Sequence, residues 1–154
     1  MNKTATLMLL MLVALPAAQP LHAQDQARLK IVYMGFADTV ELDGERLNYS
    51  FVYSSAPRAA VLDLAAEQKQ LFVDWLDRCR VFSLAGPDVL VAEPNHPGAE
   101  ERNSLQVEFG DKKIELFWRG VSRWNDRAQQ ELLERAVDEL TKLSLRLVRE
   151  SGLL

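Results

Sequence analysis

Two glycine-containing turns, each flanked by alternating apolar and polar residues, constrain the fold of this chain most. In "NSLQVEFGDKKIELFWRG", residues 103–120, a turn at Gly110–Asp111 places Val107 opposite Ile114. Glycine suits the first loop position of a type II′ hairpin turn, because it tolerates a positive φ. The stretch therefore predicts an antiparallel hairpin with one apolar face.

An earlier hairpin is predicted around "ELDGER", residues 41–46. Asp43–Gly44 is typical of a type I′ turn, which would place Glu41 opposite Arg46. The following segment, "RLNYSFVYS", alternates strictly and predicts a half-buried strand. The preceding residues 28–42 change their apolar parity, which we interpret as one strand with a bulge near Gly35.

The first hairpin is followed by a segment with helical apolar spacing. Asp63 is predicted to cap a helix that begins near Leu64, and its apolar stripe includes Phe72, Trp75 and Cys79. Cys79 is the single cysteine of the chain, so no internal disulfide can form. Its position in the stripe predicts a buried, structural thiol.

The second hairpin is followed by a long amphipathic helix. Asn125 or Asp126 is the predicted N-cap, and Gly152 is predicted to end the helix. Apolar residues recur at helical spacing from Leu133 to Leu147. This stripe predicts a helix that packs one side against a sheet.

These elements predict an α+β fold. An antiparallel sheet of four to five strands, built from two hairpins, has one face covered by two amphipathic helices, in the order ββα(β)ββα. The hydrophobic cluster "VFSL", residues 81–84, follows the first helix and is predicted to dock the chain against the core. Asp38 does not fit this pattern, because the predicted register places it on the apolar face opposite Tyr49.

The start of the chain predicts a secretory signal peptide over residues 1–23. Lys3 precedes an apolar run over residues 5–15, which is shorter than the ~20 residues that span a bilayer. Cleavage after Ala23 leaves a single α+β domain, residues 24–154, with no stable membrane anchor. We therefore expect a periplasmic or secreted protein, periplasmic in a Gram-negative source.

Charge argues against two classes of partner. The chain has 18 basic and 22 acidic residues, a net charge of −4, and the charges are dispersed. Nucleic acids and anionic membrane surfaces favour clustered lysine and arginine. We expect no nucleic-acid partner and predict a protein partner in the envelope or among secreted proteins.

Motifs for catalysis, metals or cofactors are absent from the sequence. After removal of the signal, His96 is the single histidine, and metal sites usually need several ligands. We expect no metal and no cofactor. An alternative is a small hydrolase that uses carboxylates such as Glu93 and Glu100 in the 86–103 loop. We predict that the protein is more a binding domain than an enzyme.

A candidate binding face lies at the end of the second hairpin. Phe117 falls on the polar side of its strand, beside Arg119, and Trp118 and Trp124 are close in sequence. Aromatic side chains and arginine are enriched in protein interfaces. These four residues are the predicted binding site of a small exported interaction domain.

Several short segments resemble a known family. "GFA" at residues 35–37, the helix leading into "VFSL", the hairpin "LQVEFGDKKIELFW" and the closing helix are similar to small emfourin-type inhibitors of thermolysin-like proteases. Met34 stands where that family tends to have a second glycine, and the hairpin around Asp43–Gly44 is an insertion. The resemblance implies protein binding. Among binding functions, the first alternative is inhibition of a secreted hydrolase.

Overall fold

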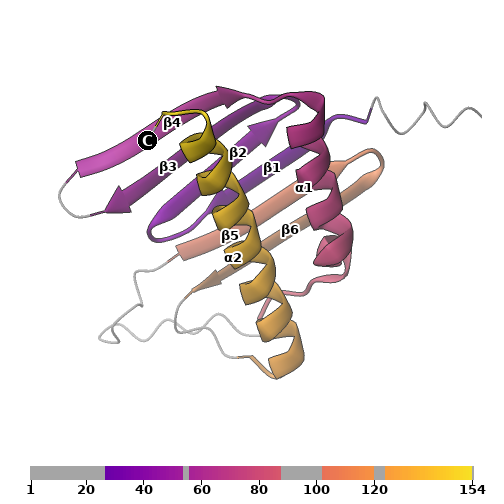
Figure 1. The fold of residues 1–154 in the computed structure, drawn as a ribbon. Coiled ribbons are helices and arrows are strands. Elements are labelled where there is room, and N and C mark those ends of the chain that lie inside the picture. Colours follow the sequence, from indigo (N-terminus) through magenta and orange to yellow (C-terminus); the bar gives the residue numbers. More distant parts are fainter. Residues whose placement is uncertain (1–26, 54–55, 88–101, 120–123, 154) are drawn as a thin grey trace, which may run out of the picture.

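The computed structural model describes residues 27–53, 56–87, 102–119 and 124–153, and it has an α+β fold. A six-stranded antiparallel sheet is combined with two helices (Figure 1). The strands are β1 (Leu29–Met34), β2 (Asp38–Asp43), β3 (Arg46–Tyr53), β4 (Ala56–Asp63), β5 (Arg102–Phe109) and β6 (Lys112–Arg119). The helices are α1 (Ala66–Arg78) and α2 (Arg127–Glu150). The predicted fold class is confirmed, but the prediction of four to five strands is wrong.

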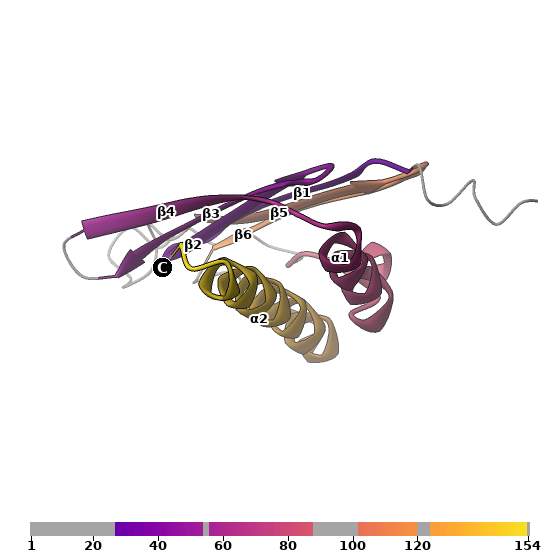
Figure 2. The ribbon, with the colours of Figure 1, turned by 45° about the horizontal axis from the view of Figure 1, so that its top comes forward.

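The strands lie in the order β4-β3-β2-β1-β5-β6, so β4 and β6 form the two edges. Both helices lie on the same face of the sheet (Figure 2). Helix α2 crosses the middle of this inner face, and α1 lies beside it (Figure 1). Parts of the sheet extend past α2: the end of β3, the start of β4, the start of β5 and the end of β6 (Figure 1).

Residues 28–42 form two strands instead of one bulged strand. The chain reverses between Met34 and Asp38, and the amide of Gly35 donates a hydrogen bond to the carbonyl of Asp38 at 2.8 Å. In the resulting pair, Ile31 lies opposite Leu42. Apolar residues switch from odd to even positions along this segment because the chain reverses direction at the turn. Both strands therefore keep their apolar side chains on the inner face of the sheet.

The turn of the next hairpin lies one residue later than predicted. Asp43 is opposite Arg46, so the loop is Gly44–Glu45. Gly44 has φ +65° and Glu45 does not have a positive φ, a pattern that fits a type II′ turn instead of type I′. Asp43 remains in its strand, where its carboxylate accepts two hydrogen bonds from Arg28 at 2.7 Å.

Residues 56–63, which precede the predicted helix, form strand β4, and the sequence did not predict this strand. Asp63 lies opposite Arg46 at the end of this strand and does not cap α1. Helix α1 begins at Ala66, and the side chain of Gln68 accepts a hydrogen bond from the amide of Ala65 at 2.9 Å. The element order is therefore ββββαββα instead of ββα(β)ββα, and "VFSL" contains a 3₁₀ turn, η2 (Val81–Ser83), in which Val81 is buried.

The hairpin of β5 and β6 turns at Gly110, which has φ +62°. Val107 lies opposite Ile114, the pair that the alternation of this segment predicts. On the other face, Lys113 and Glu108 form an ion pair at 2.9 Å. Val107 is fully buried under the helices, so this hairpin contributes directly to the core.

The core lies between the inner face of the sheet and the two helices. Trp75 of α1 is fully buried, and its indole nitrogen donates a hydrogen bond to the carbonyl of Ala136 in α2 at 2.9 Å. A buried indole N–H needs such a partner, so this bond fixes α1 against α2. Helix α2 starts at the N-cap Asp126, whose carboxylate accepts hydrogen bonds from the amides of Ala128 and Gln129.

Candidate functional site: a groove along helix α2

One row of the inner sheet face lies beyond α2. Asp38 of β2 is opposite Phe51 of β3, and Phe51 is opposite Arg58 of β4. These residues share a face with buried Tyr49 and Ala60, because side chains two positions apart along a strand point the same way. The row is thus a continuation of the core surface that carries polar and partly exposed side chains.

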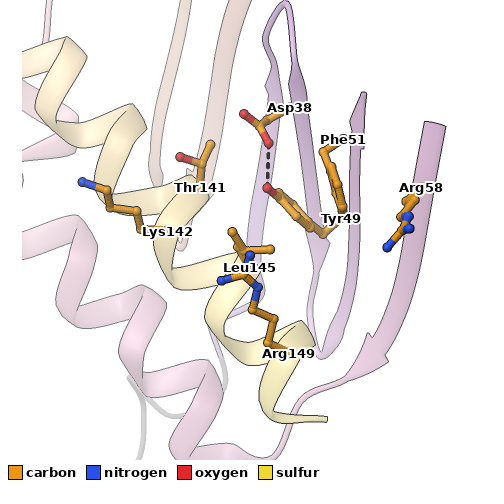
Figure 3. A pocket seen from close by; sticks show the side chains of 8 residues that line it. All are labelled: Asp38, Tyr49, Phe51, Arg58, Thr141, Lys142, Leu145 and Arg149. Carbon is orange, nitrogen blue, oxygen red and sulfur yellow. Dashed lines mark hydrogen bonds between the residues drawn. The ribbon is translucent and has the colours of Figure 1, made fainter. Parts of the chain in front are cut away.

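This row and the side of α2 enclose a groove of about 430 Å³ (Figure 3). The volume lies within the roughly 300–1,000 Å³ that is usual for ligand sites. The groove, which we call the α2 groove, is lined by Asp38, Tyr49, Phe51, Arg58, Thr141, Lys142, Leu145 and Arg149.

The floor of the α2 groove is aromatic and carries a fixed carboxylate. The hydroxyl of Tyr49 donates a hydrogen bond to Asp38 Oδ1 at 2.6 Å (Figure 3). The rings of Tyr49 and Phe51 pack with their centroids 5.8 Å apart. Asp38 therefore stays at the edge of the apolar face because a buried tyrosine supplies its hydrogen bond, which accounts for the misfit seen in the sequence.

Three cations surround this floor, but they differ in their partners. Lys142 forms an ion pair with Asp138 at 2.7 Å, and its nitrogen points away from the strands in Figure 3. Arg58 and Arg149 line the same groove and form no ion pair with any other residue that the structure describes. The groove therefore has a local excess of positive charge that an anionic group could neutralise.

A second hollow of about 260 Å³ lies along the N-terminal half of α2, and we call it the tryptophan hollow. It is lined by Tyr33, Asn103, Trp118, Arg119, Trp124, Gln130, Leu133, Glu134, Val137 and Asp138. The rings of Tyr33 and Trp118 stack with centroids 6.5 Å apart. Burial, and to a lesser extent the charge of Asp38, raise the pKa of Tyr33 to about 12. Tyr33 thus belongs to the tryptophan hollow, where it stacks on Trp118, and it is also close enough to Asp38 of the α2 groove to be affected by that charge.

The structure brings together three of the four predicted binding residues. Trp118, Arg119 and Trp124 all line the tryptophan hollow. Phe117 lies on the opposite, open face of the sheet and is 52% exposed. There it is opposite Ser104, which is opposite Met34, another exposed side chain. Phe117 and the tryptophans therefore belong to two different surfaces.

Most of the α2 groove could not be predicted from the sequence. Its one visible signal was Asp38, a charged residue on an apolar face. The alternation of "RLNYSFVYS" places Phe51 on the apolar side of its strand, and no sequence pattern distinguishes Arg58 or Arg149. They meet only because β4 pairs with β3 at the end of the sheet that lies near the C-terminal half of α2.

The remaining chemical candidates lie elsewhere. Glu93, His96 and Glu100 fall outside the described residues. Cys79 is buried, and its Sγ donates a hydrogen bond to Glu139 at 3.4 Å. Burial and this bond raise the pKa of the thiol to about 11. Within the described ranges, no three His, Cys, Asp or Glu side chains are grouped as metal ligands would be.

Fold and groove together define a small α+β domain with a ligand-sized groove between one helix and the end of a sheet. None of the helices in the described part of the chain is long and apolar enough to cross a membrane. No protein-family model matches the chain, and a search of curated proteins found no relative. The resemblance to emfourin-type inhibitors thus depends on the short segments quoted above.

Proposed function

We propose that this protein is a small exported binding domain that holds part of an envelope or secreted protein partner in the α2 groove. The signal-peptide pattern of residues 1–23 supports export to the periplasm or the medium. The tryptophan hollow, with Trp118, Arg119 and Trp124, extends the same binding site. The role is non-catalytic.

The observation that carries this proposal is the composition of the α2 groove. Phe51 and Leu145 are only partly buried and offer apolar area to a ligand. Arg58 and Arg149 supply positive charge beside that area. Aromatic anchors next to arginine are the residue types that dominate the binding energy of protein interfaces. A partner that covered both would gain from apolar burial and from charge pairing.

A second candidate surface is the open face around Met34 and Phe117, which are 53% and 52% exposed. The alternation of the second hairpin predicts Phe117 on this polar side of the sheet. Two narrower alternatives are inhibition of a secreted hydrolase and a carboxylate-dependent hydrolase that uses the 86–103 loop. The α2 groove is preferred because charge and apolar area meet there within one concave site.

The test compares two double charge reversals with the same net charge. Arg58→Glu with Arg149→Glu alters the α2 groove, while Arg127→Glu with Arg146→Glu alters exposed positions of α2 outside it. Each protein is purified as cells process it and used to recover partners from envelope extract. We expect the groove variant to lose at least about tenfold in recovery of the partner. Equal recovery by both variants would refute the proposal.

A further inference from the structure

We infer that the α2 groove recognises the C-terminal tail of its partner, an extended peptide that ends in a free α-carboxylate. This inference rests on the proposed function, because it names the ligand class of the same groove. Three observations carry it: the arginines at one end, the polar floor in the middle, and the length of the site along α2.

Arg58 and Arg149 indicate the anionic end of the ligand. They come from the edge strand β4 and from the last turns of α2, so they reach the groove from both sides. The planar guanidinium of arginine matches a carboxylate, with two parallel N–H donors for its two oxygens. A terminal carboxylate would supply the ion pair that both arginines lack among the described residues.

The floor of the groove favours a peptide over a lipid chain. Asp38 Oδ1 is occupied by the Tyr49 hydroxyl, and the second oxygen points away from Tyr49 in Figure 3. An alkyl chain laid over Asp38 would remove water from that oxygen without replacing the hydrogen bond, which is unfavourable. A peptide has backbone N–H groups that can donate to it. Phe51 and Leu145 can then contact an apolar side chain near the C-terminus.

The α2 groove and the tryptophan hollow both lie along helix α2 and together form an elongated surface. The α2 residues that line the two hollows run from Gln130 to Arg149, about 28 Å along the helix axis. An extended peptide covers that distance with about eight residues. With its carboxylate at Arg58 and Arg149, its N-terminal part would lie toward Tyr33 and the tryptophan hollow.

The experiment uses two pools of acetylated octapeptides with the same randomised sequences. One pool ends in a free carboxylate and the other in an amide. The protein, purified as cells process it, is immobilised, and the retained peptides are quantified by mass spectrometry. We expect the free-acid pool to be retained at least about tenfold more than the amide pool, since only the acid pairs with both arginines.

Two variants connect this preference to the groove. Arg58→Gln with Arg149→Gln should abolish the preference for the acid, while Arg127→Gln with Arg146→Gln should keep it. The wild-type comparison of acid with amide needs no variant, so it decides the inference even if a substitution disturbs folding. Sodium dodecanoate, tested below micelle formation, represents the lipid alternative.

Equal retention of the two pools, or no retention of either, overturns the inference. So does a preference for the acid that survives the Arg58→Gln and Arg149→Gln changes, or binding of dodecanoate in the absence of peptide binding. None of these results refutes the proposed function, because the charge-reversal test uses the natural partner. Suppose that the groove variant loses the partner in that test, but acid and amide peptides are retained equally. The α2 groove would then remain the binding site, and only recognition of a C-terminal carboxylate would be excluded.

Discussion

The hydrogen bond from Tyr49 to Asp38 is the contact that keeps a carboxylate on the groove floor. Replacing Tyr49 with phenylalanine removes the donor while keeping the ring. Asp38 is only half-buried, so water can replace part of the bond. We expect Tyr49→Phe to lower the free energy of unfolding by about 1 kcal/mol in urea denaturation. It should also weaken ligand binding, because Asp38 loses its fixed orientation.

Tyr33→Phe is the matched control for this change. Tyr33 is a buried tyrosine of β1, which β2 separates from β3, and its hydroxyl makes no hydrogen bond with another described residue. Its replacement should leave stability nearly unchanged. An equal loss of stability in both variants would mean that the Tyr49–Asp38 bond has no special role.

Cys79 should be unreactive in the folded protein. It is 4% exposed, and its pKa is raised to about 11 by burial and by the bond to Glu139. Only the thiolate attacks common thiol reagents, and at pH 8 well under about 1% of such a thiol is ionised. We expect labelling to be slow in native protein and fast in urea. Rapid labelling of the native protein would contradict the burial of this side chain.

At the scale of elements, helices α1 and α2 are joined at the surface by Glu139. Its carboxylate accepts hydrogen bonds from Arg135 of α2 at 2.9 Å and from Arg78 of α1 at 3.0 Å. These bonds lower the pKa of Glu139 from its ordinary value of 4.5 to about 2. A carboxylate with a lowered pKa stabilises the folded state above its ordinary pKa, and this contribution is lost as the pH falls toward 2.

Glu139→Gln should therefore destabilise the protein in a pH-dependent way. Both arginines are more than half exposed, so screening limits the loss to about 1 kcal/mol at pH 7. The difference from wild type should shrink as the pH falls below about 4.5 and disappear only below about pH 2. Glu131→Gln, which breaks a single exposed pair with Arg127, is the control. A constant difference at all pH values would contradict the assignment.

Elements that are specified by their own turn residues and apolar alternation could be predicted from the sequence. Elements that form only by pairing with another strand could not. The Gly110 turn could be read from the sequence because the alternation on both sides agrees with it. Strand β4 was missed because "PRAAVLDLAAEQ" contains alanines and charged residues suited to a helix. It becomes a strand because β3 offers an unpaired edge, and such tertiary pairing overrides local preference.

The reversal at Gly35 was missed for a related reason. A bulge and a tight turn both change the apolar parity of a segment, so periodicity alone cannot separate them. In the structure the segment forms a turn between β1 and β2. Strand β1 also pairs with β5 along its other edge, so β1 lies in the middle of the sheet. The sequence thus predicted the class of the fold, and the strand count depended on pairing across the whole sheet.

At the scale of the whole molecule, export should be visible in the mass of the protein. The pattern of residues 1–23 predicts a mature N-terminus at Gln24. Intact-mass analysis of protein recovered from the envelope or the medium should give the mass of residues 24–154. A mass that includes the first 23 residues would contradict the export prediction without affecting the groove.

The candidate site was predictable only in part, because it is a property of the assembled molecule. Trp118, Arg119 and Trp124 could be selected from composition, since they are close in sequence. Arg58 and Arg149 are 91 positions apart in the printed sequence and meet through the pairing of β4 and the length of α2. Nothing in either local segment distinguishes a groove arginine from a solvent-exposed one.

The most direct test of the groove is a methyl NMR spectrum of the protein with and without the partner recovered from envelope extract. Leu145 lies in the α2 groove. Met34 lies on the open face of the sheet, in the same cross-strand row as Ser104 and Phe117. After removal of residues 1–23, Met34 is the single methionine, so its signal is unambiguous. We predict that the Leu145 methyl signals shift on binding while the Met34 signal stays in place. A shift of Met34 with unchanged Leu145 signals would contradict the account and assign binding to the open face.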